Sequence, residues 1–342
     1  LTSLASAVPI LLDIPVGNLV QRAGEKIVIF LGLLTAVFPP LFYYTAFVPL
    51  LFVGKFVEGV AKSLIWNGGW SLTLKSSSDS AESESISIFL LGVNMAIVIG
   101  PVLGGFIIEG YGFKLPMLLW ALTSSLALIV FYSYIGTERE KGLENSIEDL
   151  FHRETYFNDF HHLKENWSNL RQEFSLIFLY SIIFSFYWLA IPLLLDQMDA
   201  NFAEMGLIFG FAALPKMFQF IFGDLADNIG KYKTVKILSF LLVPTLFLMS
   251  VVQSLVVTGV LFFFARVFTA GMSPSIHAIF DSQTPDDVEG EMTGFNELSK
   301  HLGQAIGPVF AGTVASVWSL NASFVAASGV AALILAMASL DF

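Results

Sequence analysis

The sequence contains no cysteine, which excludes disulfide bonds and thiolate metal sites and leaves the redox compartment open. A phosphate-binding glycine loop of the Walker type is also missing, so ATP is not expected to drive the protein unless a partner supplies that function. Neither a basic nucleic-acid patch nor the spacing of zinc ligands occurs along the chain. We therefore expect no nucleic-acid partner, no bound metal and no cofactor.

Charged residues are scarce as well. They make up 13% of the 342 residues, whereas a soluble domain carries roughly 25%. Hydrophobic residues reach 55%, and the mean hydropathy is +0.74. Uncharged runs at residues 27–47, 115–134 and 237–252 each approach the roughly 20 residues that cross a bilayer. The composition therefore predicts an all-α membrane protein that uses the lipid bilayer as its solvent.

Hydropathy and turn residues together predict about eleven transmembrane helices. The predicted spans lie near residues 1–17, 27–47, 49–74, 86–109, 115–135, 174–195, 202–223, 234–252, 255–279, 296–318 and 320–339. Lys and Arg gather in alternate loops, which places those loops and Phe342 in the cytoplasm and the chain in the plasma (inner) membrane. The chain starts at Leu1 without a basic n-region or a cleavage site, so we interpret this start as a truncation and not as a signal peptide.

A polar segment divides the predicted spans into five before it and six after it. This segment, residues 136–173, contributes many of the acidic residues behind the net charge of −11. The pattern predicts an N-terminal bundle over residues 1–135, a cytoplasmic linker over residues 136–173 and a six-helix C-terminal bundle over residues 174–342. We expect the protein to be a monomer.

Two local patterns repeat at nearly the same spacing. GNLVQRAGEK begins at Gly17 and GDLADNIGKYK begins at Gly223, an offset of 223 − 17 = 206. IGPVLGG ends at Gly105 and IGPVFAG ends at Gly312, an offset of 312 − 105 = 207. Since the patterns are unrelated to each other, the shared spacing indicates parallel repeats, which one large class of secondary transporters contains.

These repeated residues resemble a known family. The pattern G-x-L-A-D-x-x-G-basic resembles the signature loop of the major facilitator superfamily, and GP-x-x-GG resembles its fifth-helix motif, most often seen in drug-exporting antiporters. The resemblance covers nearly the whole chain and implies two pseudo-symmetric helical bundles, with the family's first helix missing from this sequence. The first loop departs from the pattern at Gln21 and Glu25, whereas the second keeps Asp227 and Lys231.

The resemblance also implies a set of residues that change their contacts when a transporter opens. In that interpretation Asp227, Arg22 and the next helix N-terminus form charge contacts across the domain interface, which Asp13 joins. Glycines in the loops allow tight turns with positive φ, and the GP motif allows close helix approach and a bend. The alternative is that these residues serve only turns and packing. The set is Asp13, Gly17, Arg22, Gly24, Gly100, Pro101, Gly104, Gly105, Gly223, Asp227, Gly230, Lys231, Gly307 and Pro308.

Polar stripes inside two spans are the main indication of substrate chemistry. Lys55, Glu58, Lys62 and Trp66 follow the spacing i, i+3, i+7, i+11 and share one helical face. Arg266, Thr269, Ser273 and His277 repeat this spacing at an offset of 266 − 55 = 211. Ionisable groups in a bilayer are unfavourable by roughly 2.5–3.5 kcal/mol each, so we expect the stripes to line one polar cavity. Further candidates for this cavity are Asn94, Trp188, Lys216, Gln219, Glu297 and Lys300.

The polar stripe of the third span also has a purely structural interpretation. Glu58 and Lys62 could satisfy each other as an i,i+4 pair, and Lys55 and Lys62 could extend towards the membrane surface. In family terms, however, Lys55 occupies the arginine position of an R-x-x-x-G motif that is associated with proton transfer, with Gly59 as its glycine. Glu58 is the well-placed candidate for carrying the proton in the first half.

Three functions remain open on these residues, and the first is the leading hypothesis. It is a proton-coupled antiporter that exports a small amphipathic or anionic solute by alternating access. The second is an uptake carrier for an organic anion or a sugar derivative. The third is a membrane-embedded lipid-modifying enzyme that uses Asp224, Asp227, His277 and Asp281, and a non-transporting sensor is also conceivable. Because the repeat explains the DLAD residues better, we predict that the protein is not an enzyme.

Overall fold

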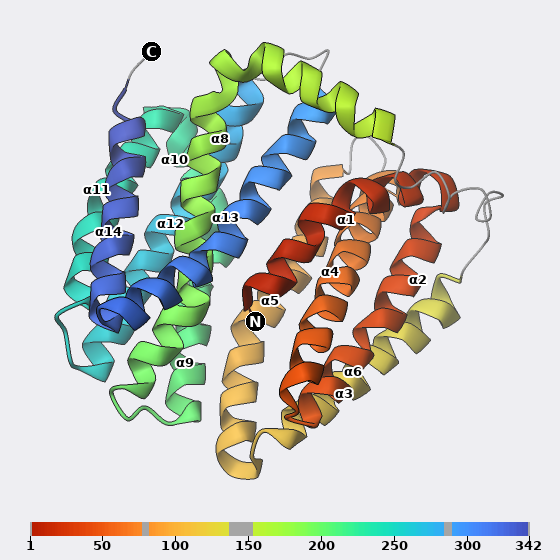
Figure 1. Ribbon diagram of the computed structural model, residues 1–342, viewed down its shortest axis with the longest axis horizontal. Coiled ribbons are helices and arrows are strands. Elements are labelled where there is room, and N and C mark those ends of the chain that lie inside the picture. Colours follow the sequence, from red (N-terminus) through yellow and green to blue (C-terminus); the bar gives the residue numbers. More distant parts are fainter. Residues whose placement is uncertain (1, 77–81, 137–152, 284–288, 341–342) are drawn as a thin grey trace. The chain divides into compact units, whose positions relative to one another are not determined.

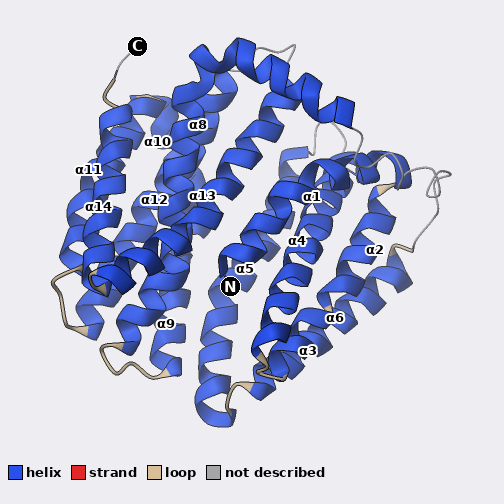
Figure 2. Cartoon of the chain, in the orientation of Figure 1, coloured by secondary structure: helices blue, strands red, loops and turns tan. Residues whose placement is uncertain are grey.

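The computed structural model describes residues 2–76, 82–136, 153–283 and 289–340, and these are helical with short connections. Figure 2 shows helices and loops throughout the described part of the chain, without a strand. The prediction of an all-α fold is therefore confirmed. Part of the predicted linker, residues 137–152, lies outside the described residues.

The chain forms two compact units. The first unit comprises Leu1–Val93 with Gly110–Phe157, and the second comprises Asn94–Glu109 with Asn158–Phe342. The predicted division at residues 135 and 173 stays a prediction. The helices of the first unit are α1 (Thr2–Ala23), α2 (Glu25–Ala36), α3 (Phe38–Tyr44), α4 (Val48–Ser76), the start of α5 (Glu82–Tyr111) and α6 (Lys114–Tyr134), as labelled in Figure 1.

The second unit contains the rest of α5 up to Glu109 and, from Asn158 onward, α8 and the helices that follow it. These are α8 (Arg153–Asp196), α9 (Phe202–Ala213), the 3₁₀ helix η1 (Leu214–Phe218), α10 (Gln219–Ile229), α11 (Lys231–Met249), α12 (Leu255–Gln283), α13 (Glu289–Val317) and α14 (Leu320–Met337). Within this unit α11 packs between α12 and α14. Its core is a continuous apolar cluster contributed mainly by α8, α11, α12 and α14.

Eight helices in the described part of the chain are long and apolar enough to cross a membrane. A ninth span results if the two arms of α1, which bend by 54° between Ser3–Asp13 and Pro15–Ala23, are taken together. α4 and α13 are 29 residues long, but charged side chains interrupt their apolar sequence. The apolar helices, α1, α4 and α13 correspond one by one to the predicted spans.

Prolines divide two spans that the sequence predicts as single helices. The span near residues 27–47 separates into α2 and α3 just before Pro39 and Pro40. The span near residues 202–223 separates into α9, η1 and α10 around Pro215. Proline lacks the amide hydrogen of a regular helix and clashes with the preceding turn, so the chain changes direction or tightens there. Hydropathy does not detect such breaks because the segments on both sides stay apolar.

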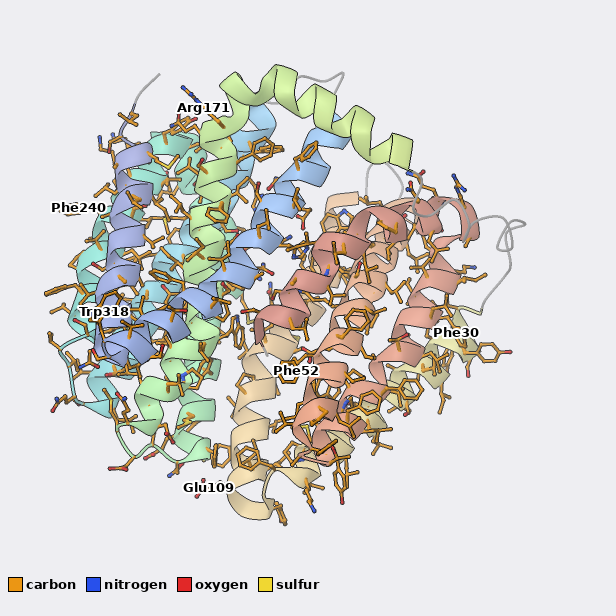
Figure 3. All side chains as sticks on the ribbon, viewed as in Figure 1. Phe30, Phe52, Glu109, Arg171, Phe240 and Trp318 are labelled. Atoms are coloured by element: carbon orange, nitrogen blue, oxygen red, sulfur yellow. The ribbon has the colours of Figure 1, made fainter. Side chains whose placement is uncertain are left out.

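Large apolar side chains lie exposed on the second unit. Phe240 of α11 is 64% exposed and Trp318, between α13 and α14, is 74% exposed. Figure 3 labels both residues at the outer side of the second unit. An apolar surface of this kind is unfavourable in water but natural in hydrocarbon. The exposed aromatic side chains therefore agree with a lipid-facing surface.

Candidate polar site in the second unit

Arg266 lies in the middle of α12 and is almost completely buried, at 8% exposure. Its guanidinium carbon is 5.2 Å from the ring centroid of Phe184 and 6.0 Å from that of Tyr187. Both rings come from α8, which packs its buried face into the core of this unit. Cations are attracted to the faces of aromatic rings, so these two side chains fix the position of the guanidinium.

A second cation approaches the same ring. Lys216 belongs to η1, and its Nζ lies 5.8 Å from the ring centroid of Phe184. Lys216 follows Pro215 at the break between α9 and α10, and this break places the lysine beside Phe184. Lys216 and Arg266, which the sequence assigned to one cavity, therefore lie at the same aromatic ring, whereas the place of Lys300 in this cavity stays a prediction.

The carboxylates of this region are already engaged with other groups. Glu297 of α13 forms an ion pair with Lys300 one turn along the helix, and it also lies 3.7 Å from Nε2 of His301. Within the described ranges, neither Arg266 nor Lys216 forms an ion pair with a carboxylate. The polar site in the second unit therefore carries an excess of positive charge.

A small hollow adjoins Arg266. It is lined by residues of α5, α8, α9 and α12, among them Tyr187, Trp188, Phe209 and Arg266. Its volume of about 10 Å³ corresponds to roughly one water molecule. The Tyr187 hydroxyl is buried and has no hydrogen-bond partner among the described residues. Trp188 stacks on Phe209 at 5.8 Å between ring centroids and so provides a flat aromatic wall.

The remaining residues of the α12 stripe extend this polar face. Ser273 is half-buried on α12, one turn beyond Thr269. Thr269 is buried and donates its hydroxyl to the carbonyl of Ala265 at 2.9 Å, whereas His277 lies half-buried further along the helix. Tyr180, Phe184, Tyr187 and Trp188 thus form the aromatic side of the site.

The stripe on α4 is organised differently. Lys55 and Glu58 form an ion pair at 2.8 Å, and the Tyr43 hydroxyl of α3 donates to the same Glu58 oxygen at 2.6 Å. Lys55 Nζ also lies 5.2 Å from the Tyr43 ring centroid. The described partners of Glu58 are therefore Lys55 and Tyr43, and the proposed i,i+4 pairing with Lys62 is not its arrangement. Sequence analysis missed Tyr43 because it is separated from Glu58 by a turn and a helix break.

A further polar group connects α1 with α4. Ser63 donates to the Asp13 carboxylate at 2.5 Å, and Asn67 donates to the same oxygen at 3.1 Å. The sequence identified Asp13 but not its two partners. Trp66 lies 39% exposed and stacks on Trp70 at 6.4 Å between centroids. Asp13 therefore links α1 to α4 within the first unit.

The two signature loops share their turn but not their charges. Gly24 and Gly230 have φ values of 87° and 99°, a region that glycine adopts readily, as the turn interpretation predicts. Near the first loop, Glu25 is buried and pairs with Lys75. Near the second loop, Lys231 donates to the carbonyl of Ala278 at 2.9 Å, whereas Asp227 is exposed.

Some of the predicted gate residues occupy open positions. Among the described residues, no atom lies within 4 Å of a Cβ placed on Gly17, Gly100, Gly104 or Gly223. Arg22 is exposed at the end of α1. The roles of these residues in a gate stay a prediction.

Close helix approach occurs instead at Gly105 and Gly206. A Cβ on Gly105 would lie 3.1 Å from the Gly206 Cα, and a Cβ on Gly206 would collide with the Pro101 carbonyl oxygen of α5. Pro101 and Gly105 are four residues apart and face α9, whereas Gly100 and Gly104 lie on the neighbouring face. On α13, Gly307 similarly leaves no space for a Cβ against α8, and Pro308 is buried.

Asn94 and Gln219 complete the predicted cavity residues. Asn94 lies in α5 and Gln219 begins α10, and both are half-buried. Neither side chain forms a hydrogen bond with another described residue.

The described residues also contain no group of three or more His, Asp or Glu side chains placed to hold a metal, and the Asp281 side chain is outside them.

Comparison with known proteins gives a consistent result. The sequence profile of the Major Facilitator Superfamily matches residues 1–175 and again residues 173–340. The multi-drug resistance efflux pump PmrA of Streptococcus pneumoniae is 24% identical over 324 residues, which cover 90% of this chain and 74% of PmrA. The multidrug resistance protein MdtG of Escherichia coli is 21% identical over 244 residues, covering 70% of this chain and 58% of MdtG.

Proposed function

Because the chain belongs to the major facilitator superfamily, we propose that it is a secondary active transporter that exports small amphipathic solutes in exchange for protons. That it is an integral membrane transporter, and no enzyme, follows from the family and from its efflux-pump relatives. Export, the exchange with protons and alternating access are the proposed parts. The observation that carries the coupling is the Lys55–Glu58–Tyr43 group within the first unit.

Glu58 has the chemistry that proton coupling requires. Its ionised carboxylate is held by Lys55 at 2.8 Å and by Tyr43 at 2.6 Å. Protonation removes the charge that holds Lys55, so α3 and α4 lose a charged contact. A ligand or proton shifts a conformational equilibrium only through such a difference in interaction between two states. Glu58 therefore couples proton binding to a change in the first unit.

Alternating access supplies the conformational change. We assign the signature loops, with Arg22, Gly24, Asp227 and Gly230, to contacts that break on opening to the cytoplasm. The contact of Gly105 with Gly206 provides a close packing surface along which α5 and α9 move as one body. The C-terminus lies in the cytoplasm, the protein resides in the inner membrane, and one chain forms the transporter.

The proposal is tested with the purified full chain in liposomes that trap a pH-sensitive dye. Addition of 2-naphthoate is expected to move protons in the direction opposite to the solute that is carried. Glu58→Gln is expected to abolish this proton movement while leaving exchange of labelled for unlabelled solute. Asp196→Asn, which neutralises an exposed carboxylate at the end of α8, serves as the matched control.

Two results would contradict the proposal. Proton movement that is unchanged in Glu58→Gln would exclude that carboxylate as the proton carrier. Solute that moves in the same direction as the protons would favour the uptake carrier. The two halves of the proposal thus fail independently of each other.

A further inference from the structure

We propose that the second unit contains an anion-binding subsite centred on Arg266, which takes the acidic group of an organic anion with a planar apolar body. The inference rests on the proposed transport function and names its substrate class. The subsite consists of Arg266, Lys216 and Tyr187, all in the second unit. The position of each of these side chains is a separate argument for it.

Arg266 is a buried cation without a counter-ion. Its guanidinium carries five N–H donors, yet its contacts within the described residues are the faces of Phe184 and Tyr187. Aromatic faces attract the positive charge, but they offer little to the N–H groups, which lie in the plane of the guanidinium. A buried charge that lacks a partner is strongly unfavourable, and a ligand anion would supply that partner.

Arg266 cannot escape this environment by extending to the membrane surface. The span in α12 runs from Leu255 to Phe280, and Arg266 is 266 − 255 = 11 residues from its start. At 1.5 Å per residue this is about 16 Å of helix, which exceeds the reach of an arginine side chain. Arg266 therefore remains in the interior, where its charge has to be compensated.

Lys216 adds a second uncompensated charge to the same place. It shares the ring of Phe184 with Arg266 and likewise forms no ion pair within the described residues. Lys300 adds little because Glu297 neutralises it. Positive charges gathered in a low-dielectric site raise the local concentration of anions. The excess charge therefore selects an anion and repels a cation.

The hollow beside Arg266 is shaped for one acceptor atom. Its volume of about 10 Å³ admits roughly a single oxygen-sized group, so the rest of the solute lies outside it. Tyr187, whose hydroxyl is buried and has no partner among the described residues, lines this hollow together with Arg266. One oxygen of a carboxylate or sulfonate placed there accepts from both. The stacked Trp188 and Phe209 offer the flat surface for the apolar body.

The test compares three probes of equal shape and different charge. Isothermal titration calorimetry with the full chain in lipid nanodiscs measures the binding of 2-naphthoate, 2-naphthamide and 2-naphthylmethylammonium. The carboxylate is expected to bind at least about tenfold more tightly than the amide, since a charged hydrogen bond is worth more than a neutral one. The ammonium is expected to bind most weakly. Equal affinities, or a preference for the cation, would overturn the proposal.

Substitutions locate the preference within the protein. Arg266→Gln is expected to abolish the preference for the carboxylate over the amide, whereas Lys236→Gln removes an exposed cation from α11 and is expected to keep it. Tyr187→Phe removes only the unpartnered hydroxyl and retains the ring under Arg266. This variant is expected to fold normally and to weaken naphthoate binding a few-fold without affecting the amide.

These outcomes separate the subsite from the transport function. A preference that persists in Arg266→Gln, or an unchanged naphthoate affinity in Tyr187→Phe, would place the anion elsewhere and refute the subsite. Should Arg266→Gln fail to fold, the Tyr187→Phe result decides. Proton-coupled export without a charge preference refutes the subsite and leaves the function standing. Selective naphthoate binding without any transport supports the subsite and refutes the proposed transport function.

Discussion

Lys55 of the first unit and Arg266 of the second each begin a polar stripe inside a span, on α4 and α12, yet their surroundings differ. Lys55 has Glu58 at 2.8 Å as a counter-ion, and Tyr43 supports the same carboxylate. Arg266 has the rings of Phe184 and Tyr187 and no carboxylate among the described residues. This difference underlies the two proposals, which are proton coupling at the Lys55–Glu58 pair and anion binding at Arg266.

The apolar cores of the two units differ in size. The buried apolar cluster of the first unit is small and centred on Val16, Val20, Val28 and Leu64. That of the second unit extends through α8, α11, α12 and α14, and it includes Tyr187, whose ring lies beside the buried Arg266. A large apolar surrounding makes an uncompensated charge less favourable, since the local dielectric constant is low. The comparison therefore predicts coupling chemistry in the first unit and ligand recognition in the second.

A carboxylate introduced beside Arg266 would give this cation a counter-ion, as Glu58 does for Lys55, and so remove the difference between the two units. Phe184 lies close to both Arg266 and Lys216, so Phe184→Glu places a negative charge between the two cations. We expect the preference of the protein for 2-naphthoate over 2-naphthamide to fall at least about tenfold, because Arg266 and Lys216 then have a counter-ion within the protein. Calorimetry measures the change. Phe184→Gln, which has the same size without the charge, should retain the preference, and an equal loss in both variants would contradict the explanation.

Helix contact surfaces offer a second comparison. Gly206→Ala in the second unit places a methyl group against the Pro101 carbonyl oxygen, and such overpacking is unfavourable by about 1–3 kcal/mol. Gly92→Ala in the first unit meets no described atom within 4 Å, so the usual gain of roughly 0.5–1 kcal/mol for alanine in a helix applies. The melting temperature in detergent is expected to fall for Gly206→Ala and to rise for Gly92→Ala. Shifts of the same sign would refute the close contact.

The ion pair of the first unit is open to a double-mutant cycle. Lys55→Gln and Glu58→Gln each leave one charge without its partner, whereas the double variant leaves none. We expect a coupling free energy of about 1 kcal/mol, as for other contacting pairs within one network. Denaturant titration of the four proteins measures it. Additive effects of the two substitutions would show that Lys55 and Glu58 do not act as a pair.

The smallest effect concerns the start of α9. Asn201 accepts from the Glu204 amide at 2.9 Å, and Glu204 accepts from the Asn201 amide at 2.9 Å, which forms a capping box. Removal of such a cap in Asn201→Ala is expected to decrease stability by about 0.5–1 kcal/mol. α2 of the first unit begins at Gly24 without a side-chain cap. Glu204→Gln retains an acceptor and should lose less, as thermal unfolding can show.

Several features were predictable because they depend on one helix at a time. The spans, the repeat and the face shared by Lys55 and Glu58 follow from periodicity within a segment. Tyr43 as a partner of Glu58 was not predictable, since a helix break separates the two in the sequence. The same holds for Gly206, whose importance comes from its contact with α5. A sequence pattern reports how residues are spaced along a helix but not which neighbouring helix they meet.

The sequence alone determined that this protein lives in lipid, that its two halves are related, and that each half carries cations inside a span. It also permits the i,i+3 pair of Lys55 and Glu58, which share one face of α4. Tertiary structure alone decided what surrounds the two cations, because the Tyr43 hydroxyl and the rings of Phe184 and Tyr187 reach them only when separate helices pack. In the first unit α3 and α4 gather a cation, a carboxylate and a hydroxyl, whereas in the second α8 presents aromatic rings to Arg266. The same repeat therefore produces a filled charge site in one unit and an open one in the other.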